Sequence, residues 1–221
     1  MNKTFRRFAV IALTLVMALG IMTGCGPKKP TAEDAQAYVK AVLDLMCTGD
    51  YDHSVDLADV ESGQETAIRD DVVKAMVEEV SADANLDPDV TAEFTDLMLD
   101  AFGKAKYTVG EATPTEDGFD VTVTMEPLKV FNVTGTEFED AVTAKVMEDP
   151  ETVAAMSEAE QTNFVMKILI DFMRTGLEDP QYDAPEEVVV HYGPIDDKGN
   201  YGCSKEDGEK LGAKLFSTEG M

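Results

Sequence analysis

The chain has 221 residues, 44 acidic and 18 basic side chains, a formal net charge of −26, 3 cysteines, 2 histidines and no tryptophan. This charge excludes nucleic acid as a partner and any extended contact with an anionic membrane surface, because both would bring like charges together. The length is sufficient to bury one sizeable core, and the charge favours a body that is exposed to water.

Residues 1–24 predict a lipoprotein signal peptide. The basic start "MNKTFRR" precedes the apolar run 8–22, which is shorter than the roughly 20 residues that a bilayer span needs. The next residues, "MTGC" at 22–25, resemble the bacterial lipobox. That resemblance implies cleavage between Gly24 and Cys25 and a diacylglycerol thioether on Cys25. An uncleaved signal anchor and an ordinary signal peptide with a chance cysteine are the alternatives.

The predicted lipid on Cys25 fixes the expected location of the protein. Two thioether-linked acyl chains of the palmitate type are enough for stable anchoring, so the membrane is an expected partner through the anchor, at its extracytoplasmic face. Residues 25–30 form a lipid-attached spacer that is stiffened by prolines, and 31–221 are expected to form a single domain. Removal of the three signal-peptide bases leaves 15 bases against 44 acids, a charge of −29.

The two remaining cysteines, Cys47 and Cys203, allow two interpretations. An extracytoplasmic location permits a disulfide between them. Alternatively, Cys47 ends an amphipathic helix, where a free thiol packs well as a small apolar group.

Three long amphipathic helices are predicted in the first half of the body, over 32–47, about 65–80, and from 88 onward. A shorter helical stretch is expected between the first two, in "GDYDHSVDLADV". The start and stop signals are a capping box of Thr31 with Asp34, Gly49 at the end of the first helix, and Asp87 before Pro88.

Period-two alternation predicts two strand pairs in the second half. "AKYTVGEAT" and "GFDVTVTMEP" form a hairpin around "TEDG", and the second strand is expected to continue beyond Pro127. "EEVVVHY" and "GNYGC" form the other pair. Three more helices are signalled by Thr136 with Glu139, Ser157 with Glu160 and a stop at Gly176, and Ser204 with Asp207. The fold class is therefore α+β: an antiparallel sheet of about four strands packed against several amphipathic helices.

Two stretches, "AYVKAVLDLMCTGDYDHSVDL" and "GFDVTVTMEPLKVF", resemble lipoproteins of Gram-positive bacteria that carry an uncharacterised domain. Those domains are placed near the cystatin-like or nuclear-transport-factor-2-like folds. The resemblance implies a curved antiparallel sheet packed on helices, sometimes around a pocket. This chain shows fewer strands than the full cone of such folds.

No pattern predicts catalysis, a cofactor or a metal site. His53 stands beside Asp52 and Ser54, but neighbours in sequence do not make a triad in space, and His191 is expected to be a satisfied strand residue. The cysteines and histidines lack the spacing of a zinc site.

We therefore expect a non-catalytic binding or accessory module of the cell envelope and not an enzyme. Its ligand is either a small molecule on a concave face with Tyr107, Phe119 or Tyr192, or another envelope protein. A carboxylate-dependent hydrolase and a purely structural envelope protein are the alternatives.

Overall fold

The computed structural model describes residues 29–57, 60–131, 136–196 and 199–217. The predicted signal peptide, with Gly24 and Cys25, lies outside these residues. Within them, no helix combines the length and the apolar character that a membrane crossing requires. The predicted α+β class is confirmed, with a four-stranded antiparallel sheet and helices around it.

The sheet is a simple meander in the order β1-β2-β3-β4. Cross-strand pairs such as Val121 with Val190 and Val123 with Val188 are buried on one face, whereas Val189 is exposed on the other. One face therefore packs on the core, as the alternation in the sequence predicts. The strands are β1 (Lys106–Pro114), β2 (Phe119–Glu126), β3 (Glu186–Pro194) and β4 (Tyr201–Cys203).

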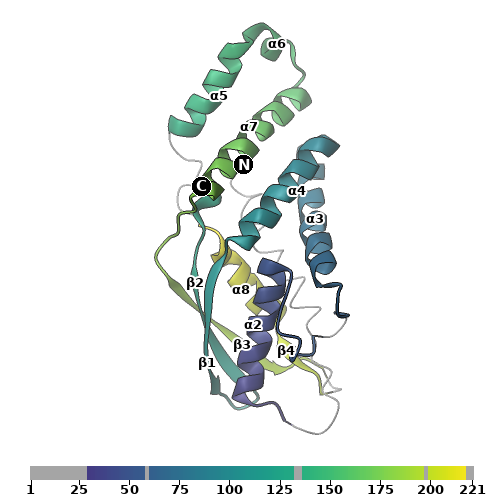
Figure 1. The fold of residues 1–221 in the computed structure, drawn as a ribbon, viewed down its shortest axis with the longest axis vertical. Helices are drawn as coiled ribbons and strands as arrows, with labels where there is room; N and C mark the ends of the chain where they lie inside the picture. Colours follow the sequence, from purple (N-terminus) through teal and green to yellow (C-terminus); the bar gives the residue numbers. More distant parts are fainter. Residues whose placement is uncertain (1–28, 58–59, 132–135, 197–198, 218–221) are drawn as a thin grey trace.

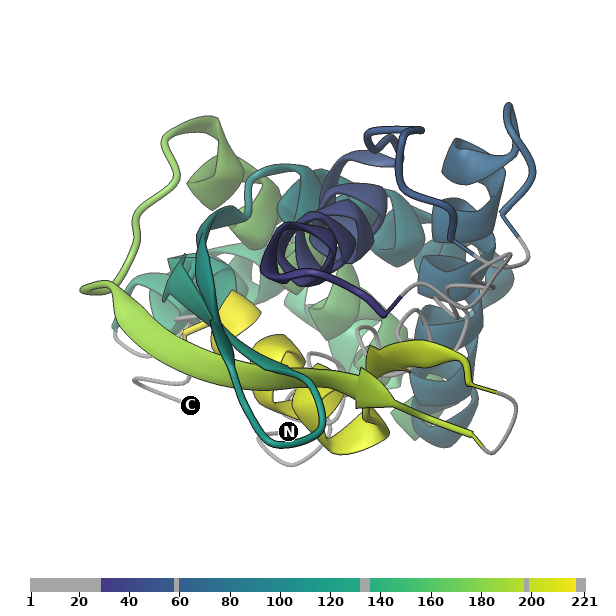
Figure 2. The ribbon, with the colours of Figure 1, turned by 90° about the horizontal axis from the view of Figure 1, so that it is seen from below.

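The inner face of the sheet is covered by α2 (Ala32–Thr48) and α8 (Lys205–Leu215). In Figure 2, β3 curves below α2 across the end of the molecule. The predicted capping box of Thr31 and Asp34 begins α2, and Gly49 ends it in the left-handed conformation with φ of 73°. This helix buries Tyr38, Val42 and Met46 completely.

The other end of the molecule is helical (Figure 1). There α4 (Pro88–Gly103) packs against α3 (Glu65–Ala84) and against α7 (Glu158–Glu178). Two further helices, α5 (Thr136–Glu148) and α6 (Pro150–Ala155), contain no buried residue among those described. Phe138 of α5 packs edge-on against Phe172 of α7, with ring centroids 5.6 Å apart.

Three local predictions are wrong, and the first is the short helix in "GDYDHSVDLADV". In its described part, Asp50 accepts a hydrogen bond from the backbone of Tyr51, and Asp52 accepts one from the backbone of Ser54. Such side-chain bonds offer the backbone an alternative to helical pairing. The described residues of the segment therefore form a loop.

The other two errors concern ends of elements. Past Pro127 the chain leaves the sheet, because Leu128 bridges to Tyr182 and Phe216 and a short 3-10 helix, Lys129–Phe131, follows. The helix predicted to stop at Gly176 continues to Glu178. Leu177, only 2% exposed, packs this last turn onto the core.

Candidate functional site

The inner face of the sheet at Tyr192 is filled by side chains, so this residue does not offer the ligand surface that the sequence suggested. Tyr192 is completely buried, with its ring 5.0 Å from that of Tyr38 and 5.9 Å from that of Tyr201. Phe119 packs against the same core. Tyr192 and Phe119, two of the three aromatic residues that suggested a ligand surface in the sequence, are thus structural. The third, Tyr107, is described next.

Tyr107 belongs to a polar hollow between α2 and β1, with Lys40, Asp44 and Cys47. The Tyr107 hydroxyl donates a hydrogen bond to Asp44 Oδ1 over 2.7 Å, and Lys40 pairs with the same carboxylate. Burial raises the pKa of Cys47 to about 12 and raises the pKa of Tyr107 as well. Both groups therefore stay protonated at neutral pH, so neither is an activated nucleophile.

The suggested disulfide between Cys47 and Cys203 is not formed; both are free and buried. Cys203 lies beside Tyr38, which precedes Cys47 by nine residues on α2, about 13 Å of helical rise. A disulfide requires Cα atoms within about 7 Å. The alternative interpretation, a buried thiol that packs as an apolar group, describes Cys47 correctly.

These thiols give a direct test of the core. Burial raises the pKa of Cys203 as it does that of Cys47, so little reactive thiolate forms at pH 8. We expect iodoacetamide at pH 8 to leave both unmodified in the folded protein and to modify both in 8 M urea, read by intact mass. A Cys introduced at exposed Glu206 is the control and should react without urea. Rapid native modification of Cys47, or an oxidised pair in non-reducing mass spectra, would contradict the structure.

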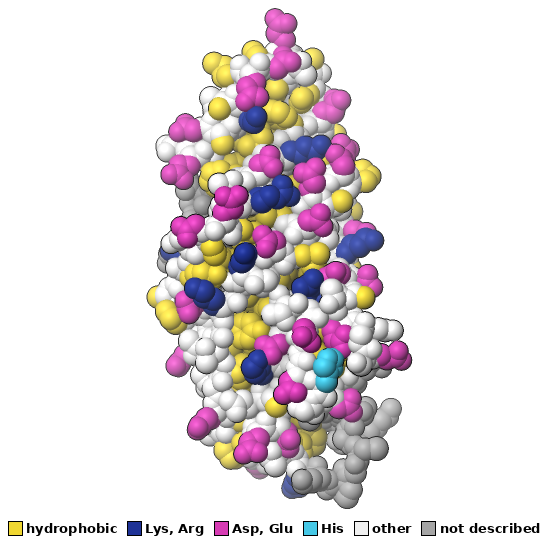
Figure 3. Space-filling view, in the orientation of Figure 1, with side chains coloured by type: hydrophobic (Ala, Val, Ile, Leu, Met, Phe, Trp, Pro, Cys, Tyr) yellow, Lys and Arg dark blue, Asp and Glu magenta, His cyan; other side chains and the backbone are white. Residues whose placement is uncertain are grey.

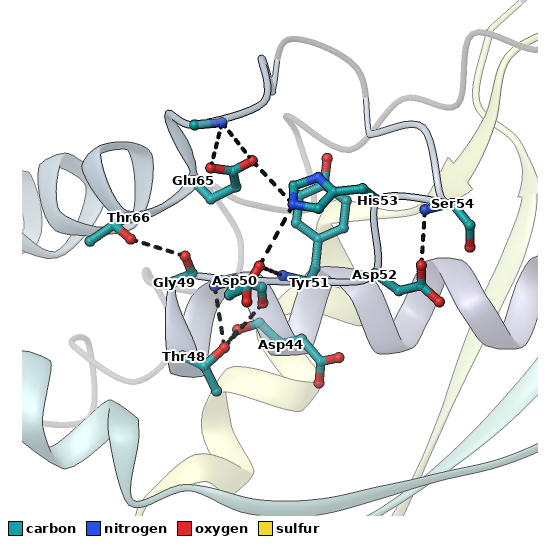
Figure 4. A network of polar contacts seen from close by, with 11 residues as sticks. Asp44, Thr48, Gly49, Asp50, Tyr51, Asp52, His53, Ser54, Glu65 and Thr66 are labelled. Atoms are coloured by element: carbon teal, nitrogen blue, oxygen red, sulfur yellow. Dashed lines mark hydrogen bonds and ion pairs between the residues drawn. The ribbon is translucent and has the colours of Figure 1, made fainter.

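His53 lies in the loop between α2 and α3 and does not form a triad with its sequence neighbours. Its Nε2 faces Glu65 Oε1 at 3.5 Å and Asp50 Oδ1 at 3.8 Å. Figure 4 shows Asp52 and Ser54 together, on the side of His53 away from Glu65. Glu65 accepts two hydrogen bonds from the backbone N–H of Gly63, and backbone hydrogen bonds lower the pKa of its carboxyl group. The network holds the loop on α3.

His191 has polar partners within the sheet for both ring nitrogens, in agreement with the predicted satisfied strand residue. Its Nδ1 lies 2.9 Å from Asp120 Oδ1, and its Nε2 lies 3.4 Å from Asp117 Oδ1. Among the described residues, no three His, Cys, Asp or Glu side chains are grouped in a way that suits a metal ion.

The candidate site is an apolar groove of about 520 Å³ between α3 and α7. Phe94 of α4 and Leu86 form its floor together with Leu169. Val80 and Ala84 line it from α3, and the remaining lining residues are Asp83 on α3 and Glu158, Gln161, Thr162, Val165 and Met166 on α7. A second hollow of about 680 Å³, between α3 and α4, is bordered by charged side chains that include Lys74, Glu78 and Asp96. The first groove suits apolar contact better.

Asn163 holds the two sides of the groove together. It lies on α7 and is 5% exposed. Its Oδ1 accepts a hydrogen bond from Asp87 N over 2.7 Å, and its Nδ2 donates to the carbonyls of Asn85 and Ala159. The turn between α3 and α4 is thereby fixed to the first turns of α7, which sets the width of the groove.

One feature of the sequence points indirectly to this site. The predicted apolar stripe of α7 runs from Phe164 to Met173 and is broader than one packing face needs. In the structure it serves two surfaces: Phe172 meets α5, whereas Val165 and Leu169 line the groove. Asn163, in contrast, is an ordinary polar residue in the sequence.

Comparisons with known proteins extend the description of the fold. No protein-family model matches the chain, and no curated protein does. The structure is similar to the crystal structure of a lipoprotein candidate, YcdA, from Bacillus subtilis subsp. subtilis str. 168, with a TM-score of 0.57 and 13% identity. The match covers 84% of this chain and 56% of the B. subtilis chain, so this protein spans little more than half of that structure. These comparisons lend no support to a cystatin-like or nuclear-transport-factor-2-like fold; the likeness is to the fold of the B. subtilis protein.

Proposed function

We propose that this protein is a lipid-anchored, extracytoplasmic binding module without catalytic activity, and that the groove between α3 and α7 is its binding site. The observation that carries the proposal is the groove itself. It combines apolar walls with a few polar groups at its rim, which is the usual composition of a binding site. The described lining residues include no Cys, His, Ser or Lys, so a nucleophile–histidine pair is absent from them, and their ionisable groups are the carboxylates of Asp83 and Glu158.

The lipobox at 22–25 supports the anchor, and so does the likeness to a lipoprotein candidate of B. subtilis. Six residue steps separate Cys25 from Thr31, which precedes α2, and an extended chain of that length spans at most about 20 Å. Figure 1 places the start of α2 at the lower end of the molecule, far from the helical end with the groove. An anchor at Cys25 would thus place the groove at the end of the molecule that is distant from the membrane.

The anchor is tested by replacing Cys25 with Ala. We expect labelled palmitate to enter the natural protein and to be absent from the variant, because the thioether sulfur is the only attachment atom in the proposal. A Cys47→Ala variant is the control and should still be labelled. Label retained by the Cys25→Ala protein would rule out this anchor.

The binding site is tested by photocrosslinking in membranes from cells that make the protein. A benzoylphenylalanine at Gln161, which lines the groove, is compared with one at Thr175, exposed lower on the same helix. We expect a discrete adduct from position 161 and none from position 175. No adduct from position 161, or the same adduct from both positions, would refute the groove as the binding site.

A further inference from the structure

We propose that the occupant of the groove is a cationic amphipathic helix of a partner protein. The inference rests on the proposed function, in which the groove is the binding site, and it adds the chemical class of the ligand. Its apolar face would pack on Phe94, Leu86 and Val165, and its Lys or Arg side chains would meet the acidic rim.

The shape of the groove favours a helix. Its lining residues on α7 run from Glu158 to Leu169 at intervals of three and four, so one face of α7 is open over three turns, about 16 Å. Such a stripe is the surface that an amphipathic helix recognises in a helix-in-groove complex.

The packing of the neighbouring helices also leaves space for a helix. α4 packs closely against both α3 and α7, whereas α3 and α7 make no comparable contact with each other in the described structure. The three helices therefore leave room beside Phe94, between α3 and α7. A fourth helix placed there would complete a four-helix arrangement and bury the apolar walls.

The negative charge of the rim favours an occupant with positive charge. Asp83 stands on the α3 side and Glu158 on the α7 side, and both are exposed. Within the described residues, neither carboxylate has an ion pair or a hydrogen-bond donor, and no Lys or Arg lines the groove. Figure 3 shows acidic side chains over the visible face, with Lys and Arg side chains among them, and apolar atoms between them at the end that carries α5, α6 and α7.

This acidic rim disfavours the two other obvious occupants. A fatty acid would bring its carboxylate to a rim that offers no cation. A second copy of the mature chain would carry its own charge of −29, 15 bases against 44 acids, to the contact. Like charges placed together across an interface cost several kcal/mol, whereas complementary charges speed association and select the partner.

The test uses a fluorescein-labelled 18-residue helix of Leu and Lys, with Leu on one face, and the lipidated full-length protein in phosphatidylcholine nanodiscs. Two further peptides share its length: one carries Glu in place of Lys, and one has the Leu positions scrambled. Fluorescence anisotropy with empty discs as background gives Kd. We expect binding of the Leu-Lys helix alone.

Two double variants locate the binding. Asp83→Lys with Glu158→Lys reverses the rim, and Asp71→Lys with Glu178→Lys makes the same change of charge on exposed residues of the same two helices outside the groove. Reversal of the rim should raise Kd by about tenfold or more, and the matched control should change it less than about twofold. Circular dichroism confirms that each variant is folded.

Equal weakening by both double variants would mean general attraction to an acidic protein and would overturn the inference. So would binding of the Glu peptide or of the scrambled peptide at similar affinity. If these results were found while Gln161 still gave its specific crosslink, the groove would remain the binding site and only the class of occupant would be wrong.

Discussion

Replacement of Gly118 by Ala is expected to lower the free energy of unfolding by about 3 kcal/mol, near the upper end of the usual cost of overpacking. Gly118 closes the turn between β1 and β2. A Cβ atom there would lie 2.1 Å from the carbonyl oxygen of Tyr192 and 3.0 Å from Gly193 Cα. Both are backbone atoms of β3, so the added methyl group must push the hairpin away from its neighbouring strand. Urea denaturation followed by circular dichroism measures the loss.

Gly176→Ala is the matched control. Gly176 lies inside α7, and nothing stands within 4 Å of the position its Cβ would take. Ala is favoured over Gly in a helix interior by about 1 kcal/mol, so this variant should be more stable than the natural protein. If the two Ala variants had the same stability, the close approach of the hairpin to β3 would be incorrect.

Asn163→Leu is the second change with a large expected effect, a loss of roughly 2 to 4 kcal/mol. Leu has a similar size but removes the hydrogen bonds to Asp87 N and to the carbonyls of Asn85 and Ala159. Each buried polar group left without a partner costs about 1 to 3 kcal/mol. The same urea titration gives the value, and the slope of the transition shows whether unfolding stays cooperative.

Gln161→Leu provides the comparison, because Gln161 is exposed two residues earlier on the same helix. We expect this variant to change stability by less than about 0.5 kcal/mol, as is usual for surface positions. A loss of similar size in both variants would show that Asn163 does not fix α7 to the turn between α3 and α4.

The helix starts were predictable because their signals are local. Thr31 with Asp34 and Ser157 with Glu160 form the expected capping boxes, and Ser204 accepts a hydrogen bond from the backbone of Asp207 at the start of α8. Each pairing lies within one helical turn and needs no distant partner. Asp87 differs from these residues: it precedes α4 but makes no side-chain cap, and its backbone N–H donates to Asn163. The predicted cap of Thr136 with Glu139 is not shown, because α5 begins at Thr136 and 132–135 lie outside the described residues.

The strands were predictable because their signal is also local. Alternation of apolar and polar residues along one strand shows which side chains are buried, whatever that face packs against. The register between β2 and β3 was not predictable from the sequence. It joins residues about 70 positions apart, such as Asp120 and His191, and only the folded sheet shows that this histidine meets a carboxylate. The end of β2 also depends on residues far along the chain, because Leu128 forms backbone bridges with Tyr182 and Phe216.

The sequence by itself determined the lipobox-like motif at 22–25, the acidic charge, the α+β class and most helix starts, because each depends on neighbouring residues or on a repeat along one segment. Tertiary structure alone decided that Cys47 and Cys203 stay apart, that Tyr192 is core, and that Asn163 joins α7 to a turn 76 positions earlier in the chain. It also decided where the groove lies. A groove is the space that three helices leave between them, and that space depends on their packing rather than on any single pattern in the chain.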